Sequence, residues 1–173
     1  MPGRLEGKVA VVTGAAGGIG RETARRFAEE DARVCVVDLA NEPGNEVAGE
    51  IEGLYVHADV TDPDDVQRMY AETAERFGGI DVLFNNAGIS PPDDASILDT
   101  EVDAWQRVQD VNLKSVYLCC KYGIPHLLER GGVDDRPAAP LQEIRDTVFA
   151  AQVDALQVDV LYPLPRVDFC VED

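Results

Sequence analysis

The feature that most constrains the fold is a glycine-rich turn that directly follows a short run of β-branched residues. Residues 8–13 read Lys-Val-Ala-Val-Val-Thr, and glycines then stand at positions 14, 18 and 20. The apolar run predicts a parallel strand buried on both faces. Apolar residues at helical spacing up to Glu30 predict a helix after the turn, and residues 33–38 form a second buried strand pattern. The order is therefore βαβ.

The alternation of strand and helix patterns continues along the chain. Further helices are predicted at 45–52, 62–77 and 101–129, and further strands at 54–57 and 82–85. Asp62 is suited to the N-cap of its helix, with Pro63 at the first helical position. Alternating strands and helices predict an α/β fold with a doubly wound parallel sheet in the order 3-2-1-4.

The glycine turn and Asp38 together favour a dinucleotide site. Gly14 permits a tight turn, Gly18 lets a pyrophosphate approach the backbone, and Gly20 lets the helix pack closely with its N-terminus aimed at phosphate. At the carboxyl end of the second strand, Asp38 can accept hydrogen bonds from an adenosine ribose and would repel a 2′-phosphate, which favours NAD over NADP. Two plainer interpretations stay open: a structural glycine turn and a solvated aspartate at a strand end.

Four ordered motifs carry a resemblance to a known family. They are Thr-Gly-x-x-x-Gly-x-Gly at 13–20, Asp59-Val60, Asn85-Asn86-Ala87-Gly88, and Val111-Asn112. They resemble the N-terminal half of the short-chain dehydrogenase/reductases, which implies a Rossmann-like sheet, truncated here after the fourth strand and the following helix. The resemblance implies that Asp59 and Val60 contact adenine, that Ile19 and the turn at 85–88 line the cofactor, and that Asn112 kinks its helix to hold a water. Taken alone, Asn112 also fits a plain polar position in a helix.

The resemblance implies an NAD-dependent oxidoreductase that transfers hydride between nicotinamide and a secondary alcohol or ketone, with a homo-oligomeric parent enzyme. In that family a serine polarises the carbonyl and a tyrosine of a Tyr-x-x-x-Lys motif transfers the proton. The only such string is Tyr117 to Lys121, on the same helix as Asn112, and we interpret it as a coincidence. We expect the catalytic Ser, Tyr and Lys to be missing and this chain to be inactive. The alternatives are a non-catalytic NAD-binding fragment and a recombined open reading frame with no selected function.

Residues 133–173 are predicted to be an aberrant tail with no independent domain, which leaves 1–132 as the NAD-binding domain. When residues 97–132 are paired in reverse order with residues 173–138, every pair except His126 with Ile144 can be written as reverse-complementary codons. Ile97 as ATC, for example, gives Asp173 as GAT. We interpret the tail as the antisense translation of an inverted duplication in the coding DNA.

Composition restricts the partners. The formal net charge of −18 repels nucleic acid and anionic membrane surfaces. No apolar run approaches the roughly 18 residues of a membrane span, and no leader is recognised, so we expect a cytoplasmic protein. The four cysteines lack metal-ligand spacing and are interpreted as reduced, small apolar residues, with no metal site.

Overall fold

Four parallel strands form a single sheet in a computed structural model that describes residues 2–90 and 96–130. The strands are β1 (Val9–Thr13), β2 (Arg33–Asp38), β3 (Leu54–His57) and β4 (Val82–Phe84). Their order is β3-β2-β1-β4, and every neighbouring pair is parallel. The predicted doubly wound α/β architecture and strand order are therefore confirmed.

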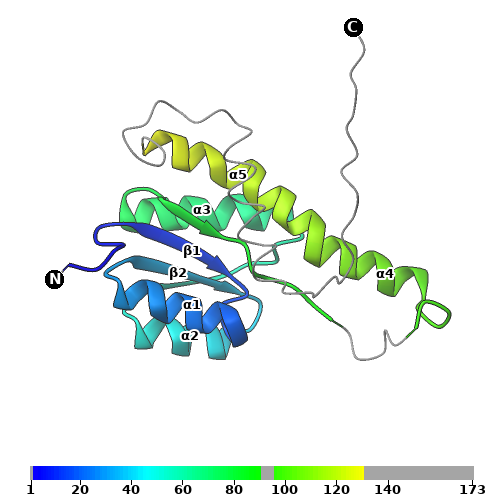
Figure 1. Cartoon of the computed structure of the whole chain (residues 1–173). Helices are drawn as coiled ribbons and strands as arrows, with labels where there is room; N and C mark the ends of the chain where they lie inside the picture. The colour runs from blue at the N-terminus through cyan, green and yellow to red at the C-terminus, as the bar shows by residue number, and fades with distance from the viewer. Residues whose placement is uncertain (1, 91–95, 131–173) are drawn as a thin grey trace, which may run out of the picture. The chain divides into compact units, whose positions relative to one another are not determined.

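Helices cover both faces of this sheet (Figure 1). They are α1 (Gly18–Glu29), α2 (Asn41–Glu50), α3 (Pro63–Phe77), α4 (Val102–Gln109), the π-helical turn η1 (Asp110–Lys114) and α5 (Ser115–Glu129). Helices α1 and α2 lie on one face, and α3 and α5 lie on the other. The turns that follow the four strands meet at the carboxyl edge of the sheet, because neighbouring parallel strands end at the same edge.

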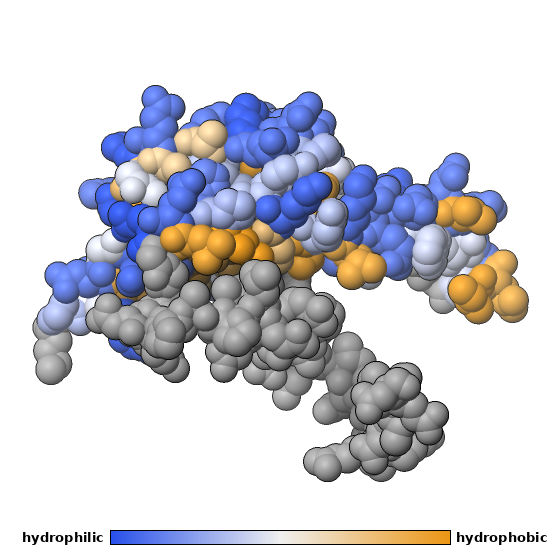
Figure 2. Space-filling model, turned by 90° about the horizontal axis from the view of Figure 1, so that it is seen from above, coloured by the Kyte–Doolittle hydropathy of each residue, from blue (hydrophilic) through white to orange (hydrophobic). Residues whose placement is uncertain are grey.

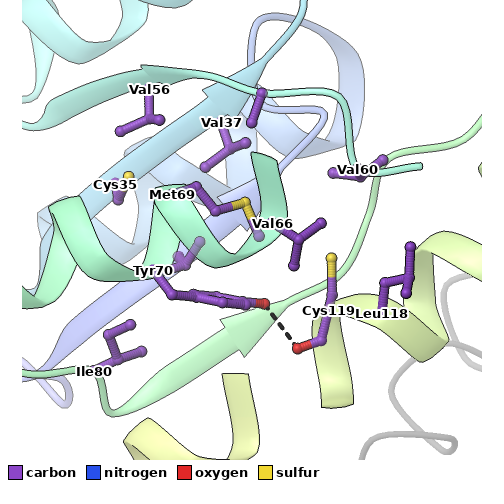
Figure 3. Packing of buried hydrophobic residues seen from close by; sticks show 12 residues of the cluster. Cys35, Val37, Val56, Val60, Val66, Met69, Tyr70, Ile80, Leu118 and Cys119 are labelled. Atoms are coloured by element: carbon purple, nitrogen blue, oxygen red, sulfur yellow. Dashed lines mark hydrogen bonds between the residues drawn. The ribbon is translucent and has the colours of Figure 1, made fainter. Parts of the chain in front are cut away.

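The core consists of two clusters, one on each face, because successive side chains of a strand point to opposite faces. Val11 belongs to the cluster beneath α3 and α5, whereas its neighbour Val12 belongs to the cluster beneath α1 and α2. In the first cluster the buried Tyr70 hydroxyl donates to the carbonyl oxygen of Cys119 at 3.0 Å (Figure 3). Strand β1 is buried on both sides, as a central parallel strand should be.

Two helix boundaries differ from the predicted ones. Helix α2 begins at Asn41 and not near residue 45, because Pro43 lies in the first turn, where a backbone N–H has no partner within the helix. The predicted helix at 101–129 contains η1, which separates α4 from α5. By contrast, the predicted cap of α3 is confirmed, since the Asp62 side chain accepts a hydrogen bond from the Asp64 amide at 2.8 Å.

Helix α4 contributes no buried residue to the core. Trp105, one of the apolar positions of the predicted long helix, remains 51% exposed, whereas Leu118 of α5 is buried. In the space-filling view, apolar patches lie at the α4 end of the molecule and along its middle (Figure 2). Only the α5 part of the predicted helix therefore packs against the sheet and α3.

The predicted tail at 133–173, with its boundary after residue 132, lies outside the described residues. Within the described part of the chain, no helix is long and apolar enough to cross a membrane. The same residues contain no cluster of three or more His, Cys, Asp or Glu side chains placed to hold a metal ion.

Candidate functional site

The predicted site residues gather at the carboxyl edge of the sheet. The glycine turn follows β1, Asp38 ends β2, Asp59 follows β3, and the turn at 85–88 follows β4. Ligands of open parallel sheets bind in the crevice outside this edge. The topology thus brings together residues that are far apart in the sequence.

The glycine turn is shaped by two close approaches. Gly14 has a φ of +64°, and a Cβ there would lie 2.8 Å from the Cα of Ala87. A Cβ on Gly20 would lie 2.1 Å from the carbonyl oxygen of Gly14. The tight turn predicted for Gly14 is present, and Gly20 lies in direct contact with the backbone of that turn.

The N-terminus of α1 faces open space beside this turn. Its N-cap residue is Gly17, no described side chain caps it, and its first turn holds no acidic residue. A Cβ on Gly18 would meet nothing within 4 Å, and Ile19 is exposed. Free backbone N–H groups and the positive end of the helix dipole make such a terminus suited to an anion.

The Asp38 carboxylate accepts hydrogen bonds from two backbone amides, one of which belongs to the glycine turn. Its Oδ2 accepts from the amide of Ala16 at 3.0 Å, and its Oδ1 accepts from the amide of Ala40 at 2.9 Å. The adjoining segments 9–20 and 38–45 contain neither Lys nor Arg. The carboxylate is therefore fixed next to the glycine turn, and neither of these two segments supplies a cation to neutralise it.

Asp59 and Val60 take different orientations after β3. Asp59 Oδ1 accepts from the amide and the hydroxyl of Thr61, at 2.9 and 2.8 Å, and the Asp59 amide donates to Asp65 Oδ2 at 2.8 Å. Hydrogen bonds from Arg68 and then from this amide lower the pKa of the Asp65 carboxyl. Val60 is only 7% exposed and packs in the core, so any contact it makes with a base would come from its main chain.

Hydrogen bonds between Thr13 and residues 86–87 join the ends of β1 and β4, and we call this set of contacts the clasp. The Thr13 hydroxyl accepts from the amides of Asn86 and Ala87, at 3.0 and 3.1 Å. The Asn86 side-chain amide donates to the carbonyl oxygens of Thr13 and Gly14, at 3.0 and 3.2 Å. Sequence reasoning gave Thr13 no role, although a hydroxyl at the end of an otherwise apolar strand was the available signal. The sequence assigns Asn86 to the turn that lines the cofactor, and in the structure its side-chain amide links the ends of β1 and β4.

Asn112 ties η1 to the segment after β4. Its Oδ1 accepts from the amide of Ile89 at 2.8 Å, and its Nδ2 donates to the carbonyl oxygen of Ile89 at 2.9 Å. Both side-chain groups of Asn112 therefore support the segment that follows Gly88. Nearby, Asn85 Nδ2 lies 3.5 Å from the sulfur of Cys120, a thiol whose pKa is raised by burial.

Tyr117 and Lys121 meet on the outer surface of α5. The Lys121 ammonium lies 5.8 Å from the centre of the Tyr117 ring and 5.2 Å from that of Tyr122, which are cation–π distances. Tyr117 is 61% exposed. The string Tyr-x-x-x-Lys thus forms a surface contact between a cation and ring faces.

Comparison with known proteins agrees with this geometry. The family model described as short chain dehydrogenase matches residues 8–134. Meso-2,3-butanediol dehydrogenase of Serratia marcescens is 42% identical over 132 residues, which are 75% of this chain and 52% of that protein. Zerumbone synthase of Zingiber zerumbet is 44% identical over 123 residues, 69% of this chain and 46% of that protein. Secoisolariciresinol dehydrogenase of Forsythia intermedia is 42% identical over 122 residues, which are 69% of this chain and 44% of that protein. The chain spans about half the length of these curated relatives.

Proposed function

The chain belongs to the short-chain dehydrogenase family, and we propose that the carboxyl edge of its sheet binds a nicotinamide dinucleotide, with NAD preferred over NADP. The observation that carries this proposal is the Asp38 carboxylate, held 3.0 Å from the Ala16 amide of the glycine turn. A ribose and the phosphates beside it would occupy these two neighbouring places. The other predicted cofactor residues, Ile19, Asp59 and the turn at 85–88, lie at the same edge.

The phosphate half of the proposal rests on α1. Its N-terminus offers backbone N–H groups that no described side chain caps, and Gly18 leaves open space in front of them. A pyrophosphate fits this chemistry because it carries the negative charge that the helix dipole attracts and needs close approach to the backbone. These residues would hold the cofactor through the main chain.

The preference for NAD follows from charge. A ribose 2′-hydroxyl can donate to a lone pair of Asp38 that the amides of Ala16 and Ala40 leave free. A 2′-phosphate would instead stand beside the carboxylate, with no Lys or Arg in segments 9–20 and 38–45 to neutralise it. Like charges about 4 Å apart repel by roughly 1 to 4 kcal/mol, depending on solvent exposure, and each 1.4 kcal/mol is about tenfold in affinity.

The reaction class that we propose for this site is hydride transfer between nicotinamide and a small secondary alcohol or ketone, in a homo-oligomeric parent enzyme. Two findings support this reaction class: the match to the short chain dehydrogenase family model and the similarity to a relative named as a butanediol dehydrogenase. The bound nicotinamide would supply the hydride acceptor or donor. This chain's own residues bind and orient it, and Asn112 supports the segment after β4 through Ile89.

For the 173-residue chain we propose NAD binding without turnover. Lys121 faces the rings of Tyr117 and Tyr122 on the surface of α5, which supports the interpretation that this string is not the acid–base pair. Loss of a general acid–base group alone costs about 10²- to 10⁴-fold in rate. We also retain the assignment of 1–132 as the nucleotide-binding domain and of 133–173 as an antisense-derived tail, and the nucleotide sequence of the coding DNA tests the latter directly.

The experiment for the proposed site compares two acid-to-amide substitutions by calorimetric titration with NAD and NADP. Asp38→Asn removes the charge beside the glycine turn. It should therefore lower the ratio of the NADP to the NAD dissociation constant by about tenfold. Glu29→Gln is the matched control, because Glu29 is exposed at the far end of α1 from the glycine turn and forms an ion pair with Arg26 at 3.0 Å. Tighter binding of NADP by the unsubstituted chain, or a ratio that Asp38→Asn leaves unchanged, would overturn the proposed preference.

A further inference from the structure

The structure points to Tyr55 as a positioning residue that fixes Asp38 and the start of α2, and so sets the discrimination between NAD and NADP. This inference rests on the proposed function, since it concerns how strictly the Asp38 carboxylate keeps its place. Tyr55 lies on β3 and would not touch the nucleotide; it acts through the junction between β2 and α2. No motif in the sequence marks this residue.

The Tyr55 hydroxyl reaches that junction from the neighbouring strand. It lies 3.0 Å from the carbonyl oxygen of Asp38 and 3.0 Å from Oδ1 of Asn41, the first residue of α2. The Asp38 carbonyl also accepts from the Ala58 amide at 3.3 Å. The last residue of β2 is therefore held by the Tyr55 side chain of β3 and by the amide of Ala58, the residue that follows β3.

The ring of Tyr55 is held in place by a glycine of α2. A Cβ on Gly44 would lie 2.2 Å from Cε2 of Tyr55, so the ring lies directly against the helix backbone. Tyr55 also packs against the core cluster beneath α1 and α2. The ring thus occupies a slot between β3 and α2, and the slot fixes where its hydroxyl points.

The chemistry of the hydroxyl suits a permanent donor. Burial, and then the charge of Asp38, raise the pKa of Tyr55, so the hydroxyl keeps its proton across the neutral range. Its hydrogen bond fixes the Asp38 main chain, while the amides of Ala16 and Ala40 fix the carboxylate. Without the hydroxyl, the junction gains freedom to move the carboxylate away from the ribose position. That motion would weaken the contact with a 2′-hydroxyl and relieve the repulsion of a 2′-phosphate, so the two affinities would change in opposite directions.

The test titrates the full 173-residue chain and its variants with NAD and with NADP, and records the melting temperature of each. Tyr55→Phe should lower the ratio of the NADP to the NAD dissociation constant by about threefold to tenfold, the range that one hydrogen bond is worth. Tyr70→Phe is the matched control, since it removes a buried hydroxyl that donates to Cys119 and not to the Asp38 junction. It should lower the melting temperature and leave the ratio unchanged. A merely structural role for Tyr55 predicts the same outcome as this control.

A second variant keeps the inference testable if Tyr55→Phe folds poorly. Gly44→Ala retains the hydroxyl but displaces the ring, and it should lower the same ratio. Nucleotide ratios that neither Tyr55→Phe nor Gly44→Ala alters would overturn the positioning role while leaving the NAD site intact. Failure of the unsubstituted chain to bind either nucleotide would instead overturn the proposed function, and the role of Tyr55 with it.

Discussion

Thr13→Val should destabilise the protein far more than its small change in shape suggests. Valine has almost the shape of threonine, and Thr13 is only 2% exposed, so the substitution fills the same space. It removes the hydroxyl that accepts from the amides of Asn86 and Ala87. Two backbone donors at the end of β4 would then lose their partner at once.

The loss of stability expected for Thr13→Val follows from those two hydrogen bonds. A buried donor left unsatisfied costs about 1 to 3 kcal/mol. Both amides are partly buried, so water can reach them in part, and we expect a total loss of about 2 to 4 kcal/mol in the free energy of unfolding. The whole free energy of unfolding of a domain of this size is only about 5 to 15 kcal/mol. The melting temperature should therefore fall by roughly 10 °C.

Urea denaturation followed by circular dichroism measures this loss, with Thr13→Ser as the matched variant. Serine keeps the accepting oxygen and loses one methyl group, which costs about 1 kcal/mol. Thr13→Val should therefore be clearly less stable than Thr13→Ser. Equal stability of the two variants, or a Thr13→Val protein within about 0.5 kcal/mol of the unsubstituted chain, would refute the clasp between β1 and β4 as a stabilising feature.

Four further substitutions test other parts of the chain. Gly20→Ala should abolish NAD binding and lower the melting temperature, because the added Cβ would lie 2.1 Å from the carbonyl oxygen of Gly14. By contrast, Gly49→Ala should stabilise the protein by about 0.5 to 1 kcal/mol, because a Cβ at this position of α2 meets no atom within 4 Å. Burial raises the pKa of Asp81, but hydrogen bonds from Arg130 and the Val9 amide outweigh it and leave that pKa lowered. A lowered carboxyl pKa contributes stability that is present above about pH 4 and is lost as the pH falls through the folded value. Arg130→Met should therefore reduce stability to urea at pH 7, and a loss that does not shrink at pH 3 would contradict this assignment. Tyr117→Phe should leave oxidation of secondary alcohols at background, and measurable turnover that this substitution removes would show that Tyr117 is catalytic.

Local patterns were sufficient to predict much of the fold. Runs of β-branched residues predict buried strands, and β2 begins and ends at the predicted residues. The cap at Asp62 was predictable because a cap depends on residues that are neighbours in the sequence. The position of Asp38 beside the glycine turn also followed, since adjacent parallel strands end at the same edge of a sheet.

Contacts between distant segments account for what the sequence did not predict. The clasp joins Thr13 to Asn86 across 73 residues, and neither residue's local pattern specifies the other. The inward orientation of Val60 depends on the packing of β3 against α3, which a two-residue motif does not encode. The exposure of Trp105 could not be read from its place in a helical pattern either, because exposure depends on which segment the helix packs against.

Titration of the purified 173-residue chain with NAD and with NADP tests the central claim most directly. Isothermal calorimetry should show saturable binding of one NAD per chain, with NADP about tenfold weaker or more, because Asp38 stands where a 2′-phosphate would bind. A chain that melts as a folded protein but binds neither nucleotide, or that binds NADP more tightly, would contradict the account.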